Sequence, residues 1–146
     1  MIVRPAAGTH GGGPGWHRVF LDANVLFSAA YRAESGLGQL WTLPATIILI
    51  SSPYAIEEAR RNLDDAGRQR LAGLVADLEN VADIATGSLP SAVDLVEKDR
   101  PILFAAIAAK ATHLLTGDRA HFGALFGRRI GGVLIERPAD YLRALG

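Results

Sequence analysis

The sequence predicts an α/β fold, with strands and helices alternating around a central parallel sheet of about five strands. Two observations support this prediction. Short apolar runs end in polar residues that favour the start of a helix, as in VFLDAN (19–24) and TIILISSP (46–53). The segments between such runs repeat apolar residues at helical spacing, as in 71–78. Buried strands that alternate with helices are typical of parallel sheets covered by helices.

Composition indicates one domain and excludes several classes of protein. The chain has 146 residues, of which 49% are hydrophobic, enough for one packed core. Its 15 basic and 15 acidic residues balance, so any binding of nucleic acid must depend on a local surface. The absence of cysteine excludes disulfides, zinc thiolate sites and cysteine nucleophiles, and is consistent with a reducing compartment. We therefore expect a cytoplasmic protein.

The chain divides into a flexible N-terminal arm, residues 1–17, and a folded domain, residues 18–146. The arm contains Gly11 to Gly13 and has neither a long apolar stretch nor a basic start, which argues against secretion. We expect its histidines, His10 and His17, to be solvated, because no metal-ligand spacing supports them. No segment approaches the length of a membrane span, so no membrane partner is expected.

Each predicted element has a local signature. Thr46 to Ile50 is a β-branched strand, and Ser52 followed by Pro53 is a strong helix start. A short third strand carrying Asp83 is expected at the sheet edge. The strands are predicted at 19–21, 46–50, 81–85, 113–118 and 131–135. The helices are predicted at 25–31, 53–65, 66–80, 102–111, 119–126 and 138–145, with a helical turn at 92–96.

Four carboxylates occupy strand ends or early helix turns. Asp22 ends the first strand and Asp118 follows the fourth. Glu58 lies at the edge of the apolar face of its helix, while Glu57 faces outward. Asp99 occupies an N-cap position before the apolar helix that begins near Pro101. Each has a simpler interpretation, since the aspartates could only cap helices and the glutamates could be ordinary solvated residues.

Together, the four carboxylates predict a metal site. Ligands of an open α/β sheet bind beyond the carboxyl ends of its strands, where these side chains are expected. Clustered carboxylates repel one another unless a cation neutralises them. Oxygen ligands, with no cysteine and no convincing histidine constellation, favour Mg²⁺ or Mn²⁺ over zinc. His113 is interpreted as structural, and His121 is nearer the site but lacks a spaced partner in the sequence.

The motifs LDANVLFSA, SSPYAIEEARRNL, KDRPILFAAIAAKATHLLTGD and VLIERPADYL resemble the PIN domain family, closest to the VapC-like toxins. The resemblance covers about Arg18 to Leu145 and implies a three-layer, Rossmann-like α/β/α fold. It also implies a metal-dependent endoribonuclease that leaves 5′-phosphate and 3′-hydroxyl ends. The family's acidic residues fall on Asp22, Glu58, Asp99 and Asp118, and its supporting polar residues on Asn24 and Thr116.

The resemblance implies roles and partners as well. We expect Asp22 and Asp99 to bind Mg²⁺ or Mn²⁺ directly, with Glu58 and Asp118 completing the site directly or through water. Arg60, Arg61 and Arg119 are candidate contacts to RNA phosphates. The expected partners are an RNA substrate, a cognate antitoxin of a type II toxin–antitoxin pair, and a second copy of the chain in a homodimer.

Two alternatives remain. A haloacid dehalogenase-like phosphatase also begins with a strand ending in Asp, but it needs a second Asp where this chain has Asn24. A catalytically silent PIN-fold module could bind RNA or an antitoxin. The intact set of carboxylates argues against the silent module, because clustering such groups is costly.

Overall fold

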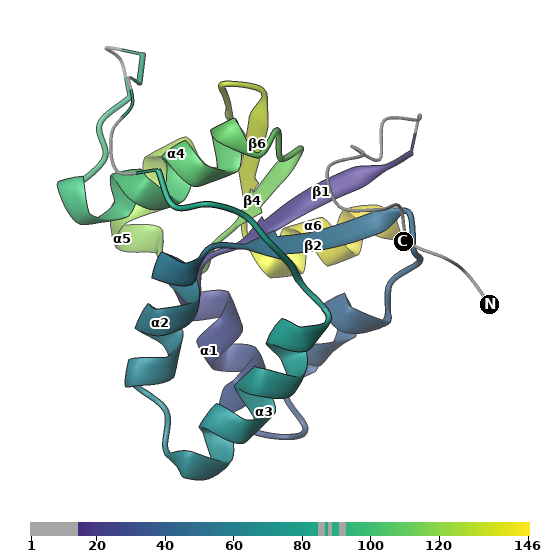
Figure 1. Cartoon of the computed structure of the whole chain (residues 1–146). Coiled ribbons are helices and arrows are strands. Elements are labelled where there is room, and N and C mark those ends of the chain that lie inside the picture. The colour runs from purple at the N-terminus through teal and green to yellow at the C-terminus, as the bar shows by residue number, and fades with distance from the viewer. Residues whose placement is uncertain (1–14, 85–86, 88, 91–92) are drawn as a thin grey trace.

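The computed structural model describes residues 15–84, 87, 89–90 and 93–146 as a central six-stranded sheet flanked by helices (Figure 1). The predicted arm, residues 1–17, lies outside the described residues except for its last three. In the order β3-β2-β1-β4-β6-β5, all neighbouring strands are parallel except β5 and β6. The strands are β1 (His17–Leu21), β2 (Ile47–Ser51), β3 (Glu79–Asn80), β4 (His113–Leu115), β5 (Arg129–Ile130) and β6 (Val133–Glu136).

The predicted α/β class is confirmed, with one more strand than expected. Gly131 and Gly132 adopt positive φ angles of 58° and 86° and turn the chain between β5 and β6. Two residues with positive φ are typical of a tight hairpin, so the first two residues of the strand predicted at 131–135 form a turn, and an unpredicted strand, β5, precedes it. A Cβ atom at Gly131 would lie 2.9 Å from Ile107, so this turn also needs glycine for space.

The strands nearest the middle of the sheet form the core. Val19, Phe20 and Leu21 of β1 are fully buried, and all five residues of β2 are buried. This matches the apolar runs in the sequence, because a strand covered on both faces has no solvent side. β1 lies between β2 and β4, so the chain leaves β1 in one direction across the sheet and later returns on its other side. The carboxyl ends of β1 and β4 therefore meet at a switch point, where α/β folds place their ligands.

Helices cover both sides of the sheet (Figure 1), and α1, α2 and α5 begin at caps expected from the sequence. Asp22, Ser52 and Asp64 cap the starts of α1, α2 and α3 through their side chains. The helices are α1 (Ala23–Tyr31), α2 (Pro53–Arg61), α3 (Asp65–Ala76), α4 (Arg100–Ala108), α5 (Arg119–Phe122) and α6 (Pro138–Leu145), with 3-10 turns η1 (Gly36–Thr42), η2 (Glu97–Asp99) and η3 (Gly123–Leu125).

Several predicted boundaries are wrong. The strand expected over 81–85 is instead the two-residue β3, because the preceding helix ends at Ala76 and pairing with β2 begins at Glu79. Its position at the sheet edge is as predicted. The helical turn expected over 92–96 falls partly outside the described residues, and 93–96 form neither helix nor strand.

The contact between α6 and the sheet is unexpectedly polar. His17 Nδ1 lies 2.6 Å from the hydroxyl of Tyr141, and the ring of His113 packs against the rings of both residues. The expectation that His17 is solvated is therefore wrong, because β1 begins two residues earlier than predicted and carries this side chain beneath α6. Burial lowers the pKa of both histidines, and that of His113 falls to about 4.

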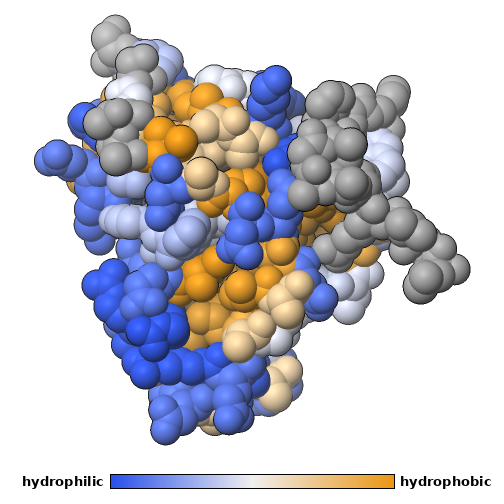
Figure 2. All heavy atoms as spheres, viewed as in Figure 1, coloured by the Kyte–Doolittle hydropathy of each residue, from blue (hydrophilic) through white to orange (hydrophobic). Residues whose placement is uncertain are grey.

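The face shown in Figure 2 separates polar and apolar side chains. Polar side chains gather over the outer ends of α2 and α3, whereas apolar side chains gather toward the middle of this face. This separation is typical of helices that present one face to a core. No helix in the described parts of the chain is long and apolar enough to cross a lipid bilayer.

Candidate active site

Asp22 lies at the centre of a hydrogen-bond network that joins β1 to β4. Its Oδ1 accepts from the backbone N–H of Ala23 at 2.7 Å. Its Oδ2 accepts from the hydroxyl of Thr116 at 2.9 Å and from the side-chain amide of Asn24 at 3.1 Å. Asp22 therefore caps α1, as the simpler interpretation predicted, and is also held in a fixed orientation at the sheet edge.

Asn24 and Thr116 fix the geometry of the loop after β4. The side-chain oxygen of Asn24 accepts from the N–H of Gly117 at 2.7 Å, and Thr116 Oγ1 accepts from the N–H of Asp118 at 3.1 Å. Thr116 is fully buried. These bonds tie the chain segment that carries Asp118 to the segment that carries Asp22. The two polar residues expected to support the site thus connect its two halves.

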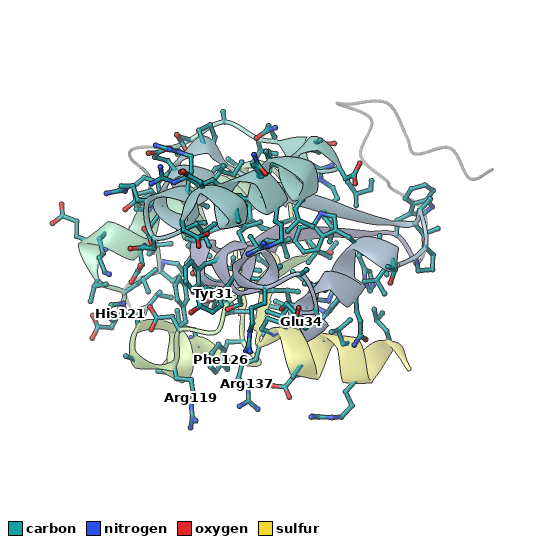
Figure 3. All side chains as sticks on the ribbon, turned by 90° about the horizontal axis from the view of Figure 1, so that it is seen from below. Tyr31, Glu34, Arg119, His121, Phe126 and Arg137 are labelled. Carbon is teal, nitrogen blue, oxygen red and sulfur yellow. The ribbon has the colours of Figure 1, made fainter. Side chains whose placement is uncertain are left out.

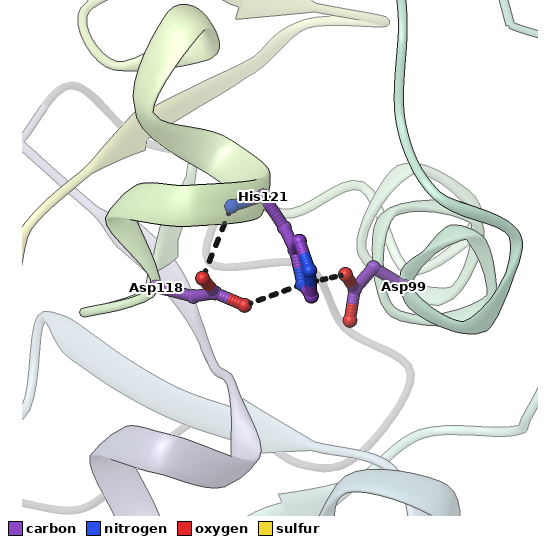
Figure 4. A group of neighbouring side chains, drawn as sticks. All are labelled: Asp99, Asp118 and His121. Carbon is purple, nitrogen blue, oxygen red and sulfur yellow. Dashed lines mark hydrogen bonds and ion pairs between the residues drawn. The ribbon is translucent and has the colours of Figure 1, made fainter.

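Asp99 is presented by the turn η2 at the start of α4. It occupies the N-cap position, but its side chain makes no capping hydrogen bond with the described backbone. The side chain is instead directed toward α5, where Oδ2 lies 2.7 Å from Nδ1 of His121 (Figure 4). Asp99 is only 9% exposed. The simpler interpretation of Asp99 as a helix cap is therefore wrong.

His121 lies between two carboxylates. Its Nδ1 is 2.7 Å from Asp99 and 2.9 Å from Oδ2 of Asp118 (Figure 4). Asp118 also caps α5, because its Oδ1 accepts from the backbone N–H of His121 at 3.1 Å. The interpretation that His121 lacks a partner is wrong, since Asp99 approaches it only through the tertiary fold.

Glu58 reaches the same region from α2. It is partly buried, and its charge raises the pKa of Asp22, which places the two carboxylates within electrostatic reach. Tyr54, one turn earlier, donates its hydroxyl to the carbonyl of Lys98 at 2.7 Å and so joins α2 to η2. Glu57 is exposed and paired with Arg60, as its outward position predicted.

The site is electrostatically unfavourable for carboxylates alone. Burial raises the pKa of Asp22 to about 6, the charges of Glu58 and Asp99 add to this increase, and hydrogen bonds from Ala23 and Thr116 oppose it. Burial also raises the pKa of Asp99, while His121 opposes that shift. A nearby cation would favour the charged form of both side chains.

An open cleft of about 680 Å³ adjoins these residues. Asn24, Glu58 and Asp118 line one part of it, and Arg137 and Arg143 line another. Both arginines are paired with Asp140. The arginines expected to bind phosphate lie elsewhere: Arg60 and Arg61 are exposed at the end of α2, and Arg119 is exposed at the start of α5.

The donor set fits a divalent cation. One ligand atom each from Asp99, Asp118 and His121 can lie within 4.8 Å of one another. Asp99 Oδ2 and His121 Nδ1 are buried and form no hydrogen bond with the described residues. Buried polar atoms ordinarily form hydrogen bonds, so this ion-paired but not hydrogen-bonded pair fits a site that would hold a cation. Carboxylate and imidazole groups are both metal ligands.

Acidic side chains at the switch point of a mostly parallel sheet define a class of α/β proteins suited to holding a divalent cation. The sequence profile of the PIN domain family matches residues 18–120. The chain belongs to the PIN domain family, whose members are generally metal-dependent nucleases. No curated protein matched the chain.

Sequence reasoning missed His121 as a member of the site and Arg137 as a residue of the cleft. The spacing of Asp118 and His121, three residues apart at the start of a helix, was visible in the sequence. The approach of Asp99 to His121 was not visible in the sequence, because it depends on how α4 packs beside α5. Arg137 immediately follows β6, and its position depends on the pairing of β6 with β4.

Proposed function

We propose that the chain is a metal-dependent endoribonuclease that hydrolyses RNA phosphodiester bonds, with Asp22, Glu58, Asp99 and Asp118 as its acidic site. The observation that carries the proposal is that Asp99 and Asp118 form one potential ligand group beside the switch point of a PIN-family sheet, where the charges of Glu58 and Asp99 also act on Asp22. A divalent cation held there, Mg²⁺ or Mn²⁺, would lower the pKa of a bound water and stabilise negative charge on the scissile phosphate.

The residues of the chain would orient that reaction. Thr116 and Asn24 donate to one oxygen of Asp22 and restrict the Asp22 side chain to few conformations. Asp22 and Asp99 would hold the cation, and Glu58 and Asp118 would complete its surroundings directly or through water. Preorganised ligands lower the barrier because they need not reorient during the reaction.

The cleft offers a path for the RNA backbone beside the acids. Arg119 and Arg137 point outward on the same side of the molecule (Figure 3). Arginine forks match phosphate oxygens and position a backbone without reading its sequence. Arg137 lines the cleft itself, so we propose it as a phosphate contact together with Arg60, Arg61 and Arg119.

Resemblance to VapC-like toxins supports a narrower proposal. The chain would be the toxin of a type II toxin–antitoxin pair, act as a homodimer and be restrained by a cognate antitoxin. Under that proposal, induced expression without an antitoxin slows growth, and the Asp22→Asn variant removes the effect.

The direct test is cleavage of a mixed RNA substrate by the purified chain with Mg²⁺ or Mn²⁺, with and without EDTA. We expect cleavage to require the metal and to fall at least 100-fold in Asp22→Asn, because the amide cannot provide the same anionic ligand. Asp94→Asn is the matched control, since this exposed aspartate precedes η2 and lies outside the carboxylate set. The RNA fragments produced by cleavage should carry 5′-phosphate and 3′-hydroxyl ends.

Two outcomes would contradict the proposal. Equal activity of the wild type and Asp22→Asn would trace the cleavage to a contaminant. A folded wild type that binds RNA but cleaves none of the mixed substrate with either metal would favour the silent binding module.

A further inference from the structure

The position of His121 is the feature that the acidic site alone does not explain. Its Nδ1 lies within 3 Å of Asp99 and Asp118, at 2.7 and 2.9 Å. Both distances are within hydrogen-bonding range, yet Nδ1 forms no hydrogen bond with the residues that the structure describes. Each contact has the distance of an ion pair, so one ring nitrogen faces two carboxylates at once.

The distances match the spacing of ligand atoms around one ion. Atoms about 2.1 Å from a six-coordinate cation lie about 3 Å apart when adjacent and about 4.2 Å apart when opposite. The atoms of Asp99, Asp118 and His121 all fall within 4.8 Å of one another. One cation could therefore contact all three after small side-chain movements.

The surroundings favour a ligand role over a structural one. Asp99 is 9% exposed, and its Oδ2 is buried without a hydrogen bond from any described residue. That oxygen faces His121 Nδ1 at 2.7 Å, and a cation bound to both atoms would offset the cost of leaving them without hydrogen bonds. The backbone N–H of His121 donates to Asp118, which fixes the position of the His121 backbone relative to that carboxylate.

We propose that His121 Nδ1 is a direct ligand of the divalent ion and that this nitrogen makes the site prefer Mn²⁺ to Mg²⁺. The inference rests on the proposed nuclease function and concerns the ligands of the same site. Mg²⁺ demands oxygen ligands in near-ideal octahedral geometry, whereas Mn²⁺, although it also favours oxygen, is a first-row transition metal and tolerates an imidazole nitrogen among its ligands. A mixed set of carboxylates and one imidazole thus discriminates between two ions that an all-carboxylate site would bind more evenly.

The first test is electron spin echo spectroscopy of the Mn²⁺-loaded full chain labelled with ¹⁵N-histidine. The proposal expects a nitrogen coupling to Mn²⁺ that disappears in His121→Ala and persists in His113→Phe. His113 is the matched control because its ring packs beneath α6 at the opposite end of β4. Circular dichroism in EDTA establishes that each variant is folded.

The second test is a Mn²⁺ titration with Mg²⁺ competition, followed by the signal of free Mn²⁺. His121→Ala should weaken Mn²⁺ binding by about tenfold or more and Mg²⁺ binding by much less. His121→Gln, which offers an oxygen, should bind both ions with a reduced preference for Mn²⁺.

The outcomes separate the two proposals. Absence of Mn²⁺ and Mg²⁺ binding in the folded wild type overturns the metal-dependent function itself. Mn²⁺ binding without a nitrogen coupling, or an unchanged preference in His121→Ala, overturns the role of His121 and leaves the nuclease proposal standing.

Discussion

Asp22 combines a structural task with the task proposed for the site. Its buried carboxylate caps α1 through one oxygen and receives two side-chain donors through the other. Burial makes the charged form costly and raises the pKa of Asp22 to about 6. The hydrogen bond from Thr116 opposes that rise, so the hydroxyl helps to keep the carboxylate charged.

Thr116→Val removes that hydroxyl and keeps the shape of the side chain. Asp22 then loses a donor, and the N–H of Asp118 loses its acceptor. We expect the free energy of unfolding to fall by about 1–3 kcal/mol, the usual cost of leaving buried polar groups unpaired. Urea unfolding in EDTA measures this loss.

Thr42→Val is the control for the Thr116 prediction. Its hydroxyl is exposed and donates only to the carbonyl of Gln39. A surface change of this kind should stay within about 0.5 kcal/mol. Equal losses in the two variants would show that the Thr116 network does not stabilise the fold.

Among the elements, α6 and the sheet meet through a polar contact. His113 of β4 has a side chain only 12% exposed and lies among the rings of His17 and Tyr141. Burial lowers the pKa of His113 to about 4, and the charges of His17 and Arg129 act in the same direction. Glu136 approaches Nε2 at 3.7 Å, too far to offset the burial. The contact between α6 and the sheet is therefore built for a neutral imidazole.

That contact makes stability depend on pH. An unfolded histidine takes up a proton near pH 6.5, whereas folded His113 does so only near pH 4. The unfolded state binds more protons between these values, so His113 favours unfolding increasingly as the pH falls through this window. Its contribution should cost about 2 kcal/mol at pH 5 relative to pH 7.

His113→Phe isolates this effect, because phenylalanine keeps a ring but does not titrate. The wild type should lose about 2 kcal/mol more than the variant between pH 7 and pH 5, measured by urea unfolding. Carboxylates contribute equally to both proteins and cancel in the difference. Parallel pH dependence in the two proteins would mean that His113 already binds its proton in the fold.

At the scale of the whole molecule, a chain with no net charge concentrates negative charge at one edge of its sheet. The 15 acidic and 15 basic residues balance, but Asp22, Glu58, Asp99 and Asp118 are brought together by four separate segments. Folding without a cation must overcome their mutual repulsion. A ligand that binds only the folded state should therefore stabilise the whole molecule.

We expect Mn²⁺ to raise the melting temperature of the wild type and to have little effect on Asp99→Asn. The variant loses one anionic ligand of the cluster. At an ion concentration 100 times the dissociation constant, binding adds about 2.7 kcal/mol. Differential scanning fluorimetry with Mn²⁺ and with EDTA measures the shift.

Asp94→Asn provides the comparison for the melting experiment, because it removes the same charge from an exposed position. This variant should retain the full rise in melting temperature on addition of Mn²⁺. An undiminished shift in Asp99→Asn would place the stabilising ion elsewhere on the molecule.

The sequence by itself determined the elements that are fixed by local chemistry. β1 and β2 were predictable because a strand covered on both faces must be continuously apolar. The starts of α1, α2 and α6 were predictable from their capping residues or prolines. The two-residue β3 was misplaced and the two-residue β5 was missed, because so few residues carry no periodic signal. Asp22, Asp99 and Asp118 were found because each follows a strand or begins a helix, and Glu58 was found because it lies at the edge of the apolar face of α2.

Only the tertiary structure decided which of these side chains meet. The order of the strands places β1 beside β4, so Thr116 reaches Asp22 across 94 positions of sequence. The packing of α4 beside α5 turns Asp99 away from its helix start and toward His121. Such contacts depend on long-range packing, and residue spacing along the chain contains no record of it. The sequence therefore determined the acids of the site, and the fold added the histidine between them.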